Sequence, residues 1–171
     1  DTRGHGKSEK VKTLHYEDMA QDMYCFIKEL WLEKPVFYGF SDGGITGIIL
    51  ASEHPDLLSA LAVSGASLNP DSTKPLPMKF FKLWSHVDRS DKMRIMMREP
   101  SITDEMLRKI TVPTFVTAGE KDVIKQSHTE HIAETIPGAQ LKIFEKTGHS
   151  GYIMNSAEIA RYLLSVLPDR N

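Results

Sequence analysis

Cysteine is almost absent from this chain. Cys25 is the single cysteine among 171 residues, so no internal disulfide can form. That pattern suits a reducing compartment and predicts a cytoplasmic protein. Cys25 lies within an amphipathic helical pattern, and we expect a buried structural thiol. It is a poor candidate nucleophile, because no histidine and no sharp turn accompany it in the sequence.

Long apolar runs and a strong charge of either sign are also lacking. No stretch approaches the roughly 18 apolar residues of a membrane span. The formal net charge of −2 gives no support for binding nucleic acid or an anionic membrane. His128 and His131 lie three residues apart without a third ligand at matching spacing, so we expect a solvated helix face and no metal. No cofactor is expected. With 40% hydrophobic and 26% charged residues, the composition is that of a globular domain.

Helical and strand patterns alternate along the chain. Apolar spacing predicts a helix over 16–30 and a second one, apolar on nearly all sides, ending near His54 before Pro55. Two segments of capping-box form, 127–130 and 155–158, predict the starts of two later helices. Strands are predicted over 35–39, 58–64, 112–119 and 141–144. This alternation favours an α/β fold with a mostly parallel, doubly wound sheet.

The strand over 35–39 runs directly into Gly39-Phe40-Ser41-Asp42-Gly43. Gly-x-Ser-x-Gly between a strand and a helix is the pattern of a nucleophile elbow. A serine on such a sharp turn is exposed to a base, and we expect the residues two before and two after it to be very small. The following helix points its first amides at the same spot. The motif could arise by chance among 11 glycines, but its position at a strand-to-helix junction favours the elbow.

An elbow of this kind requires an acid and then a histidine further along the chain. Asp122 follows the strand over 112–119, and His149 follows the strand over 141–144. In a parallel sheet both positions fall on the carboxyl edge, where such sheets bind their ligands. Glu120 competes with Asp122 for the role of the acid, and the Gly119-x-x-Asp122 spacing favours Asp122.

Together, these features resemble the α/β-hydrolase fold. The opening segment, Asp1-Thr2-Arg3-Gly4-His5-Gly6-Lys7-Ser8, is similar to the D-x-R-G-x-G-x-S loop of that family. The sequence Ser-Asp-Gly-Gly-Ile-Thr at the elbow is similar to that of the biphenyl-hydrolase-like (valacyclovirase) branch of the family. The resemblance implies a serine hydrolase with Ser41 as nucleophile, Asp122 as acid and His149 as general base. It also implies that the backbone N–H of Asp42 contributes to the oxyanion hole.

The resemblance also bears on the substrate, which would be a small-molecule ester or related acyl compound. In the valacyclovirase-like branch, an acid beside the nucleophile is associated with holding a substrate amino group. The alternative for Asp42 is a solvated or helix-capping carboxylate. Phe40 and Trp84 are further candidate substrate contacts. Thioesterases, carbon–carbon bond hydrolases and perhydrolases share the same three residues, and the sequence does not separate them from esterases.

One segment, 68–109, departs from the alternation and is rich in methionine and aromatic residues. By resemblance it is a short helical cap inserted in a core formed by 1–67 and 110–171. Its large side chains either shape an apolar acyl pocket or pack the cap onto the body. Because the cap is short, we expect small or medium substrates.

The resemblance further implies that the strands preceding the elbow strand in the family are not part of this sequence. The free edge of the elbow strand would then favour self-association. A second hypothesis follows, in which the chain is a catalytically impaired hydrolase-like domain that binds a ligand or partner without turnover.

Overall fold

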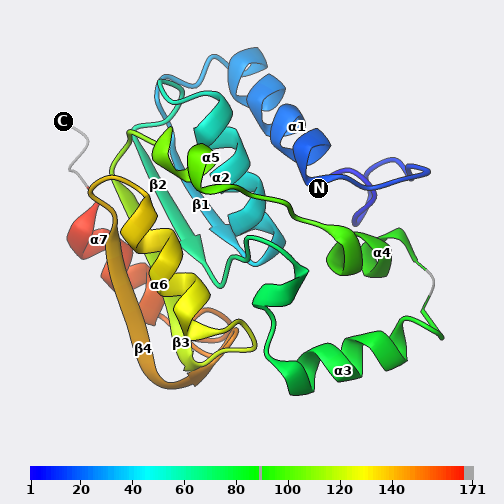
Figure 1. Cartoon of the computed structure of the whole chain (residues 1–171). Coiled ribbons are helices and arrows are strands. Elements are labelled where there is room, and N and C mark those ends of the chain that lie inside the picture. Colours follow the sequence, from blue (N-terminus) through cyan, green and yellow to red (C-terminus); the bar gives the residue numbers. More distant parts are fainter. Residues whose placement is uncertain (89, 168–171) are drawn as a thin grey trace.

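The computed structural model describes residues 1–88 and 90–167. A single four-stranded sheet forms the centre, with strand order β1-β2-β3-β4 and every neighbouring pair parallel (Figure 1). This arrangement confirms the α/β fold with a parallel sheet. The strands are β1 (Val36–Phe40), β2 (Ala60–Ser64), β3 (Thr114–Lys121) and β4 (Gln140–Gly148).

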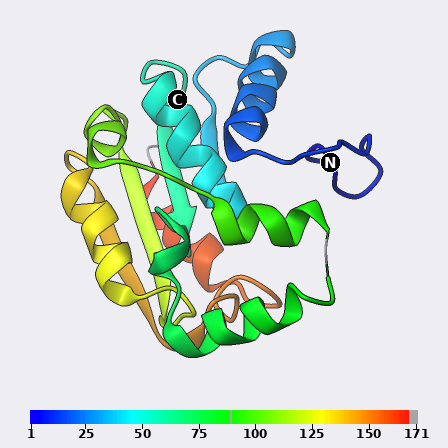
Figure 2. The ribbon, with the colours of Figure 1, turned by 45° about the vertical axis from the view of Figure 1, so that its right-hand side comes forward.

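Helices cover both faces of the sheet, as Figures 1 and 2 show. Successive side chains of a strand point to opposite faces, so Leu61 and Val63 of β2 face one layer while Ala60 and Ala62 face the other. The first layer contains α1 (Tyr16–Glu29), α2 (Asp42–Glu53) and α6 (Gln126–Thr135). The second contains α7 (Glu158–Val166).

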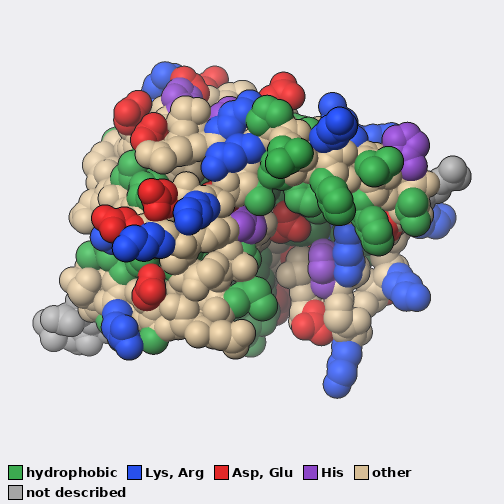
Figure 3. All heavy atoms as spheres, turned by 90° about the horizontal axis from the view of Figure 1, so that it is seen from below, with side chains coloured by type: hydrophobic (Ala, Val, Ile, Leu, Met, Phe, Trp, Pro, Cys, Tyr) green, Lys and Arg blue, Asp and Glu red, His purple; other side chains and the backbone are tan. Residues whose placement is uncertain are grey.

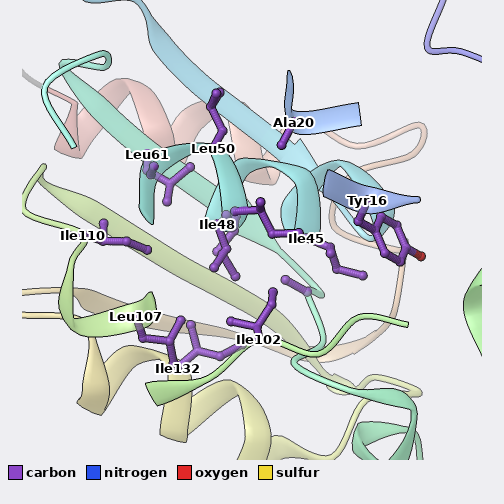
Figure 4. Close-up of a cluster of buried hydrophobic side chains, with 14 of the residues drawn as sticks. Tyr16, Ala20, Ile45, Ile48, Leu50, Leu61, Ile102, Leu107, Ile110 and Ile132 are labelled. Carbon is purple, nitrogen blue, oxygen red and sulfur yellow. The ribbon is translucent and has the colours of Figure 1, made fainter. Parts of the chain in front are cut away.

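Helix α2 lies at the centre of the larger core. Every residue from Gly44 to Ser52 is buried, as predicted for a helix that is apolar on nearly all sides. In Figure 4, Ile48 of this helix lies on the side of Ile102, Leu107 and Ile132, whereas Leu50 lies on the side of Ala20 in α1. The turn at Ser41 therefore leads directly into a helix that is buried over nine consecutive residues.

The segment 68–109 contains η1 (Pro70–Ser72), α3 (Pro75–Trp84), α4 (Asp91–Arg98) and α5 (Asp104–Arg108). In Figures 1 and 2, α3 and α4 lie beyond the carboxyl ends of the strands, while α5 packs against α2 and α6. Leu107 of α5 is fully buried. The division into a core and a cap stays a prediction, and positions 89 and 168–171 of the predicted ranges lie outside the described residues.

The start of this segment is attached to the loop after β3. Thr73 and Ile124 form an isolated antiparallel bridge. Lys74 N donates to Val123 O, and Lys125 N donates to Ser72 O, each at 2.8 Å. The chain entering α3 is thereby fixed beside Asp122.

Three sequence-based expectations were wrong in detail. Cys25 is exposed, because it lies on the outward face of α1, away from the sheet. Helix α6 begins at Gln126, so Ser127 is inside the helix and cannot cap it. Helix α7 begins at Glu158, after Asn155 has adopted a left-handed φ of 54°.

One side of β1 has no neighbour among the described strands. Tyr38 of this strand is 38% exposed, although it lies at the centre of the strand. Among the helices formed by the described residues, none is both long enough and apolar enough to cross a membrane.

Candidate active site

Ser41 sits on a strained turn between β1 and α2. Its φ and ψ angles are 54° and −115°, and its N–H donates to Ser64 O on the neighbouring strand at 2.8 Å. A Cβ atom at Gly39 would lie 2.1 Å from Gly43 O, so only glycine fits at that position. The turn presents the serine side chain at the carboxyl end of the strand, as expected for an elbow.

Asp122 lies directly after β3 and is 3% exposed. Its Oδ1 accepts hydrogen bonds from Ile124 N at 3.0 Å and from the imidazole of His149 at 2.7 Å. Burial alone would raise the pKa of Asp122, but the hydrogen bond and charge of His149 and the backbone N–H of Ile124 lower it overall. The carboxylate is therefore ionised at neutral pH in spite of its burial.

His149 follows β4 and bridges the other two residues. Its Nδ1 is 2.7 Å from Asp122 Oδ1, and its Nε2 is 3.2 Å from Ser41 Oγ. With the proton on Nδ1, the imidazole donates to the carboxylate and leaves Nε2 to accept from the serine hydroxyl. The three side chains come from the ends of β1, β3 and β4, so the structure brings together all three residues that the sequence singled out.

Two neighbouring residues, Phe40 and Gly65, lie against the imidazole of His149. The ring of Phe40 lies 4.8 Å from that of His149, centroid to centroid, at an interplanar angle of 44°. Gly65 follows β2 with a φ of 57°, and a Cβ there would approach His149 Cε1 to 2.7 Å. Sequence reasoning missed Gly65; its signal was a glycine just past a predicted strand.

A cavity of about 270 Å³ opens onto Ser41 and His149. Its walls come from the elbow, the loops after β2 and β3, helix α1 and the segment 68–109. The lining residues are Tyr16, Ser41, Asp42, Ile45, Gly65, Ser67, Pro70, Thr73, Phe81, Met96, Glu99, Val123, Ile124 and His149. The mainly apolar wall fits the hydrocarbon part of an acyl group.

Asp42 is the first residue of α2 and also lines this cavity. Its backbone N–H lies in the first turn and so has no carbonyl partner four residues back in the helix. Its Oδ1 accepts the hydroxyl of Tyr16 at 2.6 Å. Burial first, and then the charge of Asp42, raise the pKa of Tyr16. The phenol therefore stays protonated and holds the carboxylate in one orientation.

Glu99 supplies a second carboxylate to the same cavity. One oxygen accepts Tyr16 N at 3.1 Å, which caps the start of α1, and the other lies 2.6 Å from His15 Nδ1. Hydrogen bonding to Glu99, and then its charge, raise the pKa of His15. Glu99 was missed because it lies in the irregular segment between α4 and α5, where no strand pattern fixes its place.

The remaining candidates lie elsewhere. Trp84 is half-exposed on α3 and is not among the residues that line the cavity; Phe81 and Met96 of the same segment are. Phe40 contacts the imidazole of His149 and is likewise not among the lining residues. Glu120 is exposed and accepts Lys146 N at 2.7 Å, so Asp122 is the acid that reaches His149.

Side chains that could bind a metal ion come together at one place within residues 1–88 and 90–167. The one cluster of three there joins His15, Glu17 and Glu99, whose ligand atoms lie within 4.8 Å of one another. His128 and His131 are not part of it, and His131 Nε2 instead lies 2.8 Å from Asp104 Oδ1. The cluster is accounted for by the helix cap and ion pair that Glu99 already makes.

Known proteins resemble the chain in sequence and in fold. It is 24% identical to the serine hydrolase BPHL of Homo sapiens over 88% of its own length and 62% of that protein, so it spans about three fifths of this relative. A solved esterase of Exiguobacterium antarcticum is 26% identical with a TM-score of 0.76, covering 96% of this chain and 78% of the esterase. A bromoperoxidase structure from Bacillus anthracis has a TM-score of 0.83 at 19% identity, covering 99% of this chain and 80% of that one.

The profile of one family, described as the alpha/beta hydrolase fold, matches residues 1–94, which is more than half of the chain. The parallel sheet with helices on both faces and this match agree with one another. The chain belongs to the alpha/beta hydrolase fold family.

Proposed function

We propose that the chain is a serine hydrolase that cleaves carboxylic esters or related small acyl substrates through Ser41, His149 and Asp122. The observation that carries the proposal is the position of the imidazole, with Nε2 3.2 Å from Ser41 Oγ and Nδ1 2.7 Å from Asp122 Oδ1. A base within hydrogen-bond reach of a serine hydroxyl, itself oriented by a buried carboxylate, is the arrangement that activates a weak nucleophile. The hydrolase and esterase names of the relatives support the same chemistry.

The reaction takes place in two halves. Nε2 of His149 takes the proton of Ser41 as Oγ attacks the carbonyl carbon, and the carbonyl oxygen becomes an oxyanion. The protonated imidazole then gives that proton to the leaving alcohol as the carbon–oxygen ester bond breaks, which leaves an acyl-serine. Water repeats the sequence in the second half and releases the acid. Asp122 stabilises the charged imidazole throughout, and its lowered pKa keeps it ionised.

The backbone N–H of Asp42 is the donor that we assign to the oxyanion, because it follows the nucleophile at the start of α2. Loss of one such donor typically slows turnover about 10²–10³-fold. The carboxylate of Asp42 would bind a substrate amino group by charge, held in place by the hydroxyl of Tyr16. The cavity volume of about 270 Å³ favours small or medium acyl groups.

The proposal is tested with a panel of p-nitrophenyl esters and with an alkyl fluorophosphonate that labels activated serines. We expect ester turnover and labelling at Ser41, with both lost in Ser41→Ala and reduced by at least about 10³-fold in His149→Ala. Ser127→Ala is the matched control, because Ser127 is exposed on α6 and is not among the residues that line the cavity. Mass spectrometry of the labelled chain locates the modified residue.

Absence of both labelling and turnover in a folded chain would contradict the proposal and favour a domain that binds ligand without turnover. The same panel tests Asp42, by pairing an amino-acid ester with its N-acetylated form. A preference for the free amine that is lost in Asp42→Asn supports amine binding, and an unchanged preference excludes it.

A further inference from the structure

Helix α3 carries a stripe of large apolar side chains that nothing in the described structure covers. Leu76, Phe80, Leu83 and Val87 follow one another at intervals of four, three and four residues, which places them on one face of the helix and its continuation. Their exposed fractions are 79%, 69%, 70% and 76%. Figure 3 shows hydrophobic side chains gathered over this part of the surface. We call these four residues the α3 stripe.

The α3 stripe is not the face that closes the cavity. Phe81 lines the cavity, and Met78 is partly buried, so the inward face of α3 is a different one. No residue of α3 is fully buried. A helix of ten residues with one apolar face toward the cavity and a second toward solvent has more apolar surface than the chain itself buries. Exposed apolar patches of this kind mark interaction sites.

The charges around the stripe identify its partner. Lys79 and Lys82 lie between residues of the stripe and Lys74 just precedes α3, which contains no acidic residue; Asp88 follows Val87 at the far end. If two copies of the chain met through this face, their positively charged lysines would lie close together, and the charge repulsion would disfavour pairing. A surface with anionic headgroups matches both the apolar and the basic side chains. Trp84 beside the stripe is half-exposed, and indole rings favour the headgroup level of a lipid layer.

We propose that α3 binds a lipid–water interface that carries anionic headgroups, with the α3 stripe inserted among the acyl chains and Lys79 and Lys82 against the headgroups. Amphipathic helices with an apolar face and flanking lysines bind such interfaces in this way. The net charge of −2 for the whole chain predicts no such attraction, but interfacial binding depends on the local charge next to the helix. The cavity that contains Ser41 opens beside the same helix, so binding would bring it close to the lipid surface.

Flotation with vesicles of phosphatidylcholine and phosphatidylserine in equal parts tests the proposal. We expect the chain to float with these vesicles and much less with phosphatidylcholine alone. The triple variant Leu76→Ser, Phe80→Ser, Leu83→Ser should reduce binding by at least about tenfold, because it removes the inserted side chains. Leu164→Ser is the matched control: Leu164 is 82% exposed on α7, and its substitution should leave binding unchanged.

The charge contribution has its own pair of variants. Lys79→Glu with Lys82→Glu should weaken binding by at least about tenfold, since each lysine near an anionic surface contributes about a fivefold gain in affinity. Lys10→Glu with Lys12→Glu makes the same change of charge on exposed residues of the N-terminal loop and should have a much smaller effect. Circular dichroism verifies that each variant is folded.

The chain has two tryptophans, so Trp31→Phe leaves Trp84 as the sole indole. Its fluorescence should shift to the blue and be quenched by brominated lipid when vesicles are added. Equal binding by the triple variant and the Leu164→Ser control would overturn the proposal. So would a concentration-dependent dimer, seen by sedimentation, that the triple variant abolishes in the absence of vesicle binding. Ser41→Ala should bind vesicles normally, which separates this proposal from the proposed hydrolysis.

Discussion

At the scale of single residues, a backbone oxygen atom determines that position 39 must be glycine. The backbone reverses so sharply around Ser41 that Gly43 O occupies the space of a Cβ at position 39, at 2.1 Å. The close contact is what allows Ser41 to project toward His149. Gly44 is also confined, since a Cβ there would meet Ala66 Cβ at 3.0 Å. Gly43, by contrast, has no heavy atom within 4 Å of its Cβ position.

We therefore predict opposite outcomes for two alanine substitutions. Gly39→Ala should lower the free energy of unfolding by about 1–3 kcal/mol, because the backbone must move to admit the methyl group. Gly43→Ala should be neutral or stabilising by up to about 1 kcal/mol, because alanine favours the helix and meets open space. Urea unfolding followed by circular dichroism measures both. Equal losses for the two variants would contradict this reading of the turn.

The sequence expectation that the residues two before and two after Ser41 must be very small is correct at Gly39 and wrong at Gly43. The motif records the spacing but not which of the two positions faces a backbone carbonyl. Ser41, Asp122 and His149 could be found from the sequence because each directly follows a strand of a parallel sheet. The contact between Tyr16 and Glu99 could not be found in this way. It joins α1 to a segment 83 residues away, and neither a strand pattern nor a motif spacing places that segment beside the helix.

At the scale of elements, the starts of α5 and α6 have different causes. A local cap determines the start of α5, whereas a tertiary contact determines the start of α6. Thr103 caps α5 by accepting Met106 N at 3.3 Å. Ser127 begins a segment of capping-box form, yet Lys125 precedes the first helical residue and its N–H donates to Ser72 O. Contact with η1 therefore fixes the start of α6 two residues earlier than the pattern suggests.

Substitution of these two exposed residues should distinguish the two cases. Thr103→Ala should lower the free energy of unfolding by about 1 kcal/mol, because it removes the cap of the helix that carries Leu107 into the core. Ser127→Ala should be neutral or slightly stabilising, since serine in a helix interior is a weaker helix former than alanine. Thermal unfolding of both variants gives the comparison. A larger loss for Ser127→Ala would show that the capping box forms in solution.

At the scale of the whole molecule, the free side of β1 is the feature most open to association. Ser41 N donates to Ser64 O on β2, so by alternation the N–H groups of Tyr38 and Phe40 point away from the sheet. Unpaired donors on a strand with an exposed aromatic side chain, that of Tyr38, favour pairing with another chain. The prediction of self-association made from the sequence rests on this edge.

Sedimentation velocity over a range of concentrations measures this association. We expect the average mass of the parent chain to rise with concentration, and Tyr38→Lys to shift the distribution toward the monomer, because a lysine on an edge strand opposes pairing. Leu164→Lys places the same charge on an exposed residue of α7 and should change little. A parent chain that remains monomeric at every concentration would disprove self-association through β1.

The bridge between Thr73 and Ile124 has a mechanical consequence. Ile124 N also donates to Asp122 Oδ1, so one short loop both holds the acid and anchors the strand-like entrance to α3. The anchor ends at Lys74, whose N–H donates to Val123 O, and α3 begins at the next residue. A pivot of α3 about that junction would widen the mouth of the cavity while the carboxylate, its amide donor and the imidazole keep their places.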